Sequence, residues 1–175
     1  KFLAREHLIL NSISSLIKGA KNEELPEKIS DLLDKVKLVE KELSEFKISI
    51  AKNKAKSLLA GKNLIGVSEV IIAEFESGIS ADALREIALD LRNQLKNGVV
   101  VIASRGDDRA NLVAAISEGA RGAGLKAGNL IKIASQILGG GGGGKDDFAQ
   151  GGGTDQAKLS TALESIKSEI VKSLQ

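Results

Sequence analysis

The sequence contains no cysteine, no tryptophan and no tyrosine, and it holds only four phenylalanines. The absence of cysteine excludes disulfides, thiol catalysis and thiolate metal sites, and it agrees with a reducing, cytoplasmic location. Because aromatic rings are so scarce, the core must be aliphatic, and stacking of bases on aromatic platforms is nearly excluded as a binding mode. No segment approaches the roughly eighteen consecutive apolar residues that a membrane helix needs, so we expect no membrane partner.

Charge is nearly balanced overall but unevenly distributed along the chain. The 25 basic and 23 acidic residues give a formal net charge of +2. Residues 85–145 carry nine basic residues against five acidic ones. Such a local excess could face phosphate groups, although composition favours solvated surface charges equally well.

The first third of the chain has the pattern of a helical hairpin. Pro26 suits the first turn of a long helix, and Gly61 lies just past its expected end. A shorter helix precedes it and stops near Gly19, so the loop between them would form an antiparallel hairpin. The apolar residues of the long helix recur at alternating steps of three and four, which is the seam of a coiled coil. These seam residues are Ile29, Leu32, Val36, Val39, Leu43, Phe46 and Ile50.

The longer helix has more seam than the shorter one can cover. The remainder must therefore meet the globular domain or another copy of the chain, and we favour a second copy.

After Gly61 the period of the pattern changes from helical to extended. Residues 68–75 alternate as a strand, residues 99–104 form a continuous apolar run typical of a central strand, and residues 111–117 form a third strand. The turn "GDDR" at residues 106–109 makes the second and third strands a hairpin.

Helices complete this second part. An amphipathic helix with Ser80 as its N-cap lies between the first two strands. Two more are expected, at about residues 130–138, where Asn129 would be the cap, and from about residue 155. The sequence therefore predicts an α+β fold. An antiparallel helical hairpin or coiled coil spans residues 1–60, and a small α/β globular domain spans residues 64–175.

Nine of the 19 glycines lie between Gly139 and Gly153, on both sides of "KDDFAQ", in the loop that joins the last two helices. Gly139 to Lys145 satisfies the phosphate-binding pattern G-x-x-x-x-G-K. However, Asp146 stands where a serine or threonine should bind magnesium, and a helix precedes the glycines where a strand should. A nucleotide-binding loop is therefore disfavoured.

Two further interpretations of the glycines remain. Glycine tracts often form flexible linkers, but a linker has polar, replaceable neighbours, and this segment encloses one of the few phenylalanines. Alternatively, bare backbone amides converge on an anion or let a large partner come close, with Lys145 adding positive charge.

The segment from Gly124 to Gly153, "GLKAGNLIKIASQILGGGGGGKDDFAQGGG", resembles the signature of the DHHA1 domain as it occurs at the C-terminus of alanyl-tRNA synthetases. In that family a helix leads into glycines, a basic residue, a short insert ending in Ala-Gln and a closing glycine pair. The resemblance covers about residues 68–174. The family usually has Arg at the position of Lys145 and Met at that of Phe148. Lysine keeps the charge but loses the bidentate grip of arginine on phosphate.

The resemblance implies a tRNA-binding appendage that holds the outer corner of tRNA(Ala) while the acceptor end visits the aminoacylation and editing sites. Its partners would be tRNA(Ala), the catalytic and editing domains of the same parent chain, and a second copy bound through the helices. We expect no cofactor in this chain, whereas the parent enzyme would use ATP, Mg and Zn. The expected tRNA-binding residues are Arg105, Arg121, Lys126, Gly139, Gly140, Gly141, Gly142, Gly143, Gly144, Lys145, Gln150, Gly151 and Gly152.

Catalysis is not expected from this chain itself. Its single histidine, His7, is interpreted as a surface or packing residue, and the adjacent aspartates at 107–108 and 146–147 as solvated turn residues. Two alternatives stay open. The chain could be the substrate-binding half of a DHH-family phosphoesterase, which requires a preceding metal domain, or a purely structural dimerisation module.

Overall fold

The computed structural model describes residues 2–17, 20–75 and 78–174. The chain divides into two compact units, residues 1–45 and residues 46–175. Helix α2 (Leu25–Ala60) contributes to both units, so the predicted domain division between residues 60 and 64 stays a prediction. None of the helices in the described ranges combines the length and the apolar character that a bilayer crossing requires.

The first unit contains α1 (Phe2–Leu16), the short 3-10 helix η1 (Asn22–Glu24) and the first part of α2. Both predicted helices are present, while the expected helix end at Gly19 lies outside the described residues. The seam of α2 is not covered within this unit. Leu32 is 54% exposed and Val39 is 60% exposed. Helices α1 and α2 make few contacts with each other, so α1 does not cover the seam and the seam stays in solvent.

The second unit is built on one mixed six-stranded sheet with strand order β1-β2-β3-β4-β6-β5. Strands β2 and β3 are parallel, and every other neighbouring pair is antiparallel. The bounds are β1 Asn63–Ile65, β2 Ser68–Phe75, β3 Gly98–Arg105, β4 Ala110–Ile116, β5 Gly141–Gly144 and β6 Phe148–Gly153. Only β3 and β4 are buried almost throughout, as expected for the centre of a sheet covered on both faces.

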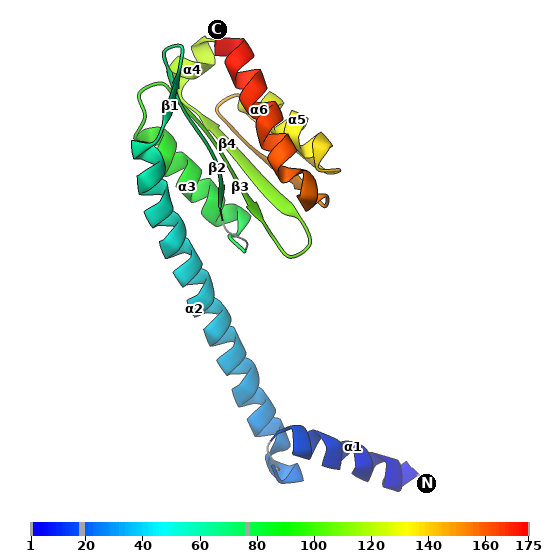
Figure 1. The fold of residues 1–175 in the computed structure, drawn as a ribbon. Coiled ribbons are helices and arrows are strands. Elements are labelled where there is room, and N and C mark those ends of the chain that lie inside the picture. Colours follow the sequence, from blue (N-terminus) through cyan, green and yellow to red (C-terminus); the bar gives the residue numbers. More distant parts are fainter. Residues whose placement is uncertain (1, 18–19, 76–77, 175) are drawn as a thin grey trace. The chain divides into compact units, whose positions relative to one another are not determined.

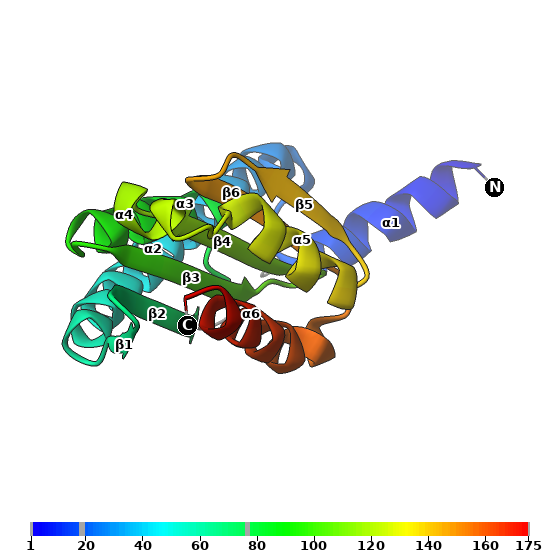
Figure 2. The ribbon, with the colours of Figure 1, turned by 90° about the horizontal axis from the view of Figure 1, so that it is seen from above.

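Helices cover both faces of this sheet (Figures 1 and 2). They are α3 (Ala81–Asn93), α4 (Glu118–Gly122), α5 (Ala127–Ile137), the 3-10 helix η2 (Gln156–Lys158) and α6 (Leu159–Leu174). Helix α3 lies on one face together with Ala51 and Ala55 of α2. Helices α5 and α6 lie on the other.

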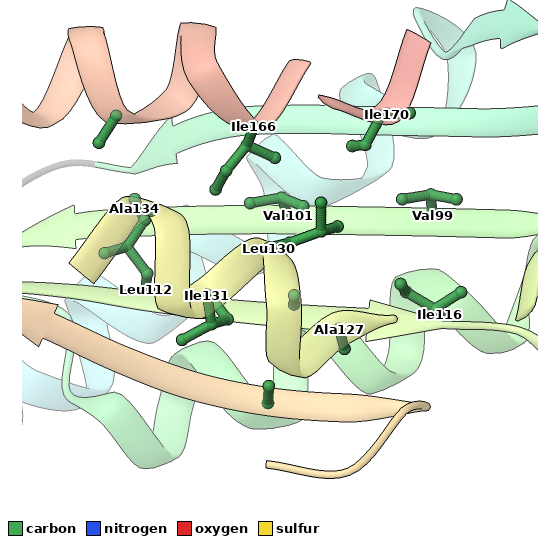
Figure 3. Packing of buried hydrophobic residues seen from close by; sticks show 14 of the residues in the cluster. Val99, Val101, Leu112, Ile116, Ala127, Leu130, Ile131, Ala134, Ile166 and Ile170 are labelled. Carbon is green, nitrogen blue, oxygen red and sulfur yellow. The ribbon is translucent and has the colours of Figure 1, made fainter. Parts of the chain in front are cut away.

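The core on the side of α5 and α6 is aliphatic, as the scarcity of aromatic residues requires. Ile166 and Ile170 of α6 point from their helix onto the sheet, over Val101 and Val99 of β3 (Figure 3). Leu130 of α5 also belongs to this cluster, and its side chain is fully buried. These contacts fix α5 on the sheet, and α5 in turn positions the glycine segment that follows it.

Most of the predicted elements of the second unit are confirmed. The strand over residues 68–75 has its predicted bounds, the hairpin of β3 and β4 is present, and Ser80 caps α3 by accepting a hydrogen bond from the N–H of Ala83 at 3.2 Å. The prediction that Asn129 caps its helix is wrong. Helix α5 begins at Ala127, so Asn129 lies inside its first turn.

Candidate functional site

The glycine segment is not the predicted loop but a β-hairpin. Strand β5 pairs antiparallel with β6, with Gly141 opposite Gly152 and Gly143 opposite Gln150. The N–H of Lys145 donates to the carbonyl of Phe148 at 2.8 Å and closes the turn "KDDF". The other side of β6 pairs with β4, so β5 is one of the two edge strands of the sheet.

Close packing explains every second glycine of β5. A Cβ on Gly142 would lie 2.5 Å from the Cα of Gly151 and 2.8 Å from the Cγ2 of Ile131. A Cβ on Gly144 would lie 2.5 Å from the Cα of Ala149. These glycines are required because α5 and β6 lie so close to β5 that a side chain would overlap them.

The alternate glycines of the same strand have no such requirement. A Cβ on Gly141 or Gly143 would meet nothing within 4 Å, and neither residue has a positive φ. Gly139 also faces open space, but its φ of 65° at the C-terminal end of α5 favours glycine for conformational reasons. Gly141 and Gly143 therefore leave the edge strand β5 without side chains on this face, which β5 shares with the exposed Gln150 of β6.

The sequence predicted bare backbone amides, and in β5 only every second residue has backbone groups that do not face β6. Hydrogen-bonded and non-hydrogen-bonded pairs alternate along an antiparallel ladder. Since Lys145 is hydrogen-bonded to Phe148, the backbone groups of Gly143 and Gly141 face β6, and those of Gly144 and Gly142 face away from it. All residues from Gly139 to Lys145 are exposed.

Three of the four predicted cations lie at the turn end of the sheet. Lys126, just before α5, forms an ion pair with Asp146 at 3.2 Å, and the N–H of Ala127 donates to the carbonyl of Asp146 at 3.0 Å. Lys145 begins the same turn and is exposed. Ile116, at the end of β4, donates its N–H to the carbonyl of Asp147 at 2.8 Å, so the end of β4 lies beside this turn. Helix α4 follows directly, and Arg121 on it is exposed.

The fourth cation, Arg105, lies at the opposite end of the sheet. Arg105 of β3 pairs with Ala110 of β4, and Ala110 pairs with Gly153. Gly153 is the last residue of β6, at the end away from the "KDDF" turn. Its guanidinium donates to Glu74 at 2.6 Å and to the carbonyl of Gln156 at 3.0 Å. The bond to Glu74 raises the pKa of Arg105 above its ordinary value. The structure thus does not bring Arg105 together with the other three cations.

Comparison with known proteins decides the family. Residues 67–172 match the DHHA1 domain family. The chain belongs to this family. It is also similar to a solved structure, the C-Ala domain of alanyl-tRNA synthetase from Aquifex aeolicus, with 33% identity and a TM-score of 0.58 over 63% of this chain and 97% of that one. The predicted resemblance is confirmed.

Two curated relatives extend the similarity beyond the DHHA1 domain to nearly the whole chain. An alanine–tRNA ligase of Streptomyces avermitilis is 38% identical over 170 residues, which is 95% of this chain and 19% of the relative. One of Bifidobacterium longum is 40% identical over 176 residues, which is 98% of this chain and 20% of the relative. The chain therefore corresponds to the C-terminal fifth of such enzymes.

Reasoning from the sequence missed one residue of this DHHA1 domain. The guanidinium of Arg85 on α3 lies 5.0 Å from the ring centre of Phe148. Side chains alternate along a strand, so Gln150 lies on the same face of β6 as Phe148, opposite to Ala149, which packs in the core with α5. Arg85 belongs to the basic stretch of the sequence, but helical periodicity alone could not show which strand it meets.

Metal binding finds no support in the described part of the chain. It holds no group of three or more histidine, cysteine, aspartate or glutamate side chains that could bind an ion. His7 is exposed on α1.

Proposed function

We propose that this chain binds tRNA(Ala) as the C-terminal appendage of an alanyl-tRNA synthetase, through the hairpin of β5 and β6 and the cations at its turn. The observation that carries the proposal is the open face at Gly141 and Gly143. Nothing within the described fold requires glycine at these two positions, whereas a partner that packs directly on the backbone would.

Three exposed cations near the turn can contact a polyanion, although Asp146 and Asp147 stand in the same turn. Lys145, Lys126 and Arg121 are exposed at one end of the sheet, where they can neutralise phosphates, and Gln150 can hydrogen-bond a ribose or base. Arg85 adds a further cation on the face of Phe148. Arg105 was predicted to belong to this set, but it lies at the other end of the sheet, and two of its donors bind Glu74 and the carbonyl of Gln156.

The shape of the surface favours folded RNA. A narrow glycine hairpin with few aromatic side chains cannot hold several splayed bases, but it can lie against the sugar-phosphate backbone of a structured RNA corner. In this proposal the appendage holds the outer corner of the tRNA and so links aminoacylation with editing. ATP, Mg and Zn then belong to the catalytic and editing domains of the parent chain.

The salt dependence of binding tests these cations directly. Each phosphate that the protein no longer neutralises should reduce the slope of log K against log salt by roughly one. Lys126→Ala with Lys145→Ala should therefore lower the slope by about two and weaken binding. Lys37→Ala with Lys41→Ala is the matched control, because it removes two exposed lysines that lie on α2. Equal slopes for both double variants would reject the proposed role of Lys126 and Lys145.

A further inference from the structure

We propose that the outer edge of β5 binds an acidic, extended segment of a partner protein, which adds to the sheet as a further strand. This outer edge consists of the backbone N–H and C=O groups of Gly142 and Gly144, which face away from β6. Strand addition here does not depend on RNA binding, because the proposed RNA contacts lie on the open face of the hairpin and at its turn.

The backbone groups of this edge have no partner in the described part of the chain. Within those residues, no hydrogen bond joins the outward N–H and C=O groups of Gly142 or Gly144 to another element. All four residues of β5 are exposed. Gly128 of α5 leaves the carbonyl of Gly144 uncrowded, since a Cβ on Gly128 would lie 3.2 Å from that oxygen. An unpaired strand edge of this kind is a site at which another chain can pair.

The opposite edge of the sheet is protected against such pairing. Strand β1 has only three residues and pairs with only the first three residues of β2. Beyond β1, the ammonium of Lys54 donates to the carbonyl of Glu74 in β2 at 2.7 Å. Short edge strands and lysines keep sheet edges from pairing with other chains. Strand β5 contains no lysine, proline or bulge, so its edge lacks this protection.

The hydrogen-bonding pattern of the edge fits a polypeptide. Gly142 and Gly144 each present one donor and one acceptor, and the backbone of an added strand complements both. A phosphate oxygen only accepts hydrogen bonds, so a nucleic-acid backbone would leave both carbonyls beside negative charge. Because β5 carries no side chains, an added strand can also come close to it.

The charges beside the edge favour an acidic segment. Lys132 lies one turn after Gly128 on α5, and therefore on the side of the helix that borders Gly144. Lys145 follows β5 directly, and its side chain lies on the face of the sheet opposite to α5. Both lysines are exposed, and neither forms an ion pair within the described residues. Acidic side chains on either face of an added strand can therefore pair with one of them.

Hydrogen exchange of the glycine amides, followed by NMR, tests strand addition. In the free chain the amides of Gly142 and Gly144 should exchange at least roughly tenfold faster than those of Gly141 and Gly143, which face β6. A short blocked peptide of glutamate and valine, with glutamates on both faces of its extended form, should slow exchange at Gly142 and Gly144 roughly tenfold. The same peptide with all its amides N-methylated keeps the charges but has no donors, and it should leave the exchange unchanged.

A charge reversal tests the preference for an acidic segment. Lys132→Glu should weaken binding of the glutamate peptide roughly tenfold, since it places a negative charge beside the edge. Lys167→Glu makes the same change in net charge on α6 and should have a smaller effect. Both lysines are exposed, so both variants should fold normally, which thermal unfolding checks.

Four results would overturn the proposal. They are an absence of protection at Gly142 and Gly144 with the glutamate peptide, equal protection by its methylated form, equal weakening by the two charge reversals, and protection of these two amides by tRNA but not by the peptide.

Discussion

The side chain of Lys126 lies 3.2 Å from the carboxylate of Asp146, and this ion pair joins the start of α5 to the turn of the glycine hairpin. Both side chains are about half exposed, so the pair contributes little to stability. Its larger effect is electrostatic, because Asp146 partly neutralises a cation that we propose for RNA binding. Asp146 therefore competes with RNA phosphate for Lys126.

Removal of that competitor should strengthen RNA binding. Asp146→Asn frees Lys126 and removes a negative charge from the turn, so affinity for tRNA should rise by roughly threefold to tenfold at moderate salt. Asp107→Asn makes the same change in net charge in the exposed turn at the other end of the sheet and should have a smaller effect. Filter binding of both variants checks this. An equal response would mean that only net charge matters.

Two neighbouring glycines should separate folding from binding. Gly142→Ala introduces a Cβ that overlaps Gly151 and Ile131, so it should destabilise the globular unit by about 1–3 kcal/mol. Gly143→Ala meets nothing within 4 Å and should leave the melting temperature unchanged or slightly raised.

The effect of Gly143→Ala on RNA binding should differ from its effect on stability. Gly143→Ala puts a methyl group on the proposed contact face of a normally folded domain, so it should weaken tRNA binding without loss of stability. Thermal unfolding and filter binding of the same preparation measure both effects. Full tRNA affinity of the Gly143→Ala chain would remove the reason for proposing contact at this face.

Packing of α6 on the sheet should dominate the stability of the globular unit. Ile166 is fully buried among aliphatic side chains, so Ile166→Ala should cost about 2–5 kcal/mol of unfolding free energy. Its exposed neighbour Lys167 offers the matched control, since Lys167→Ala should change stability by less than about 0.5 kcal/mol. Urea titration followed by circular dichroism compares the two.

Glu69 should make stability depend on acidic pH. The Lys62 ammonium at 2.7 Å and the N–H of Lys96 at 2.9 Å bind its carboxylate and lower the pKa of Glu69 below its ordinary value of 4.5. A lowered folded pKa stabilises the fold fully above the ordinary value, and this contribution is lost as pH falls through the folded pKa. Glu69→Gln should therefore destabilise the chain at pH 7 and lose less stability on acidification. Parallel pH profiles of the two chains would contradict this role.

The sequence was most informative where one interaction sets the local structure. Continuous apolar runs located β3 and β4, and the hydroxyl of Ser80 located the start of α3. The β5–β6 hairpin was missed because glycine has no side chain and therefore no alternation to detect. Its strands form because α5 and β4 provide surfaces for them, which is tertiary information.

The site was predictable in its composition but not in its arrangement. The glycines and Lys145 were visible as a motif, yet the sequence could not show that Arg105 lies at the other end of the sheet or that Arg85 reaches Phe148. Both facts depend on strand register and on the side of the sheet that α3 covers. Cation positions along a chain therefore predict a basic region, and the fold selects which cations share a surface.

Binding of full-length tRNA(Ala) and of its acceptor-stem minihelix, measured side by side with this chain, tests the central claim most directly. A hairpin that holds the outer corner should bind the full-length tRNA and lose most of its affinity for the minihelix, which lacks that corner. Equal affinity for both RNAs, or no measurable binding of either at low salt, would contradict the account.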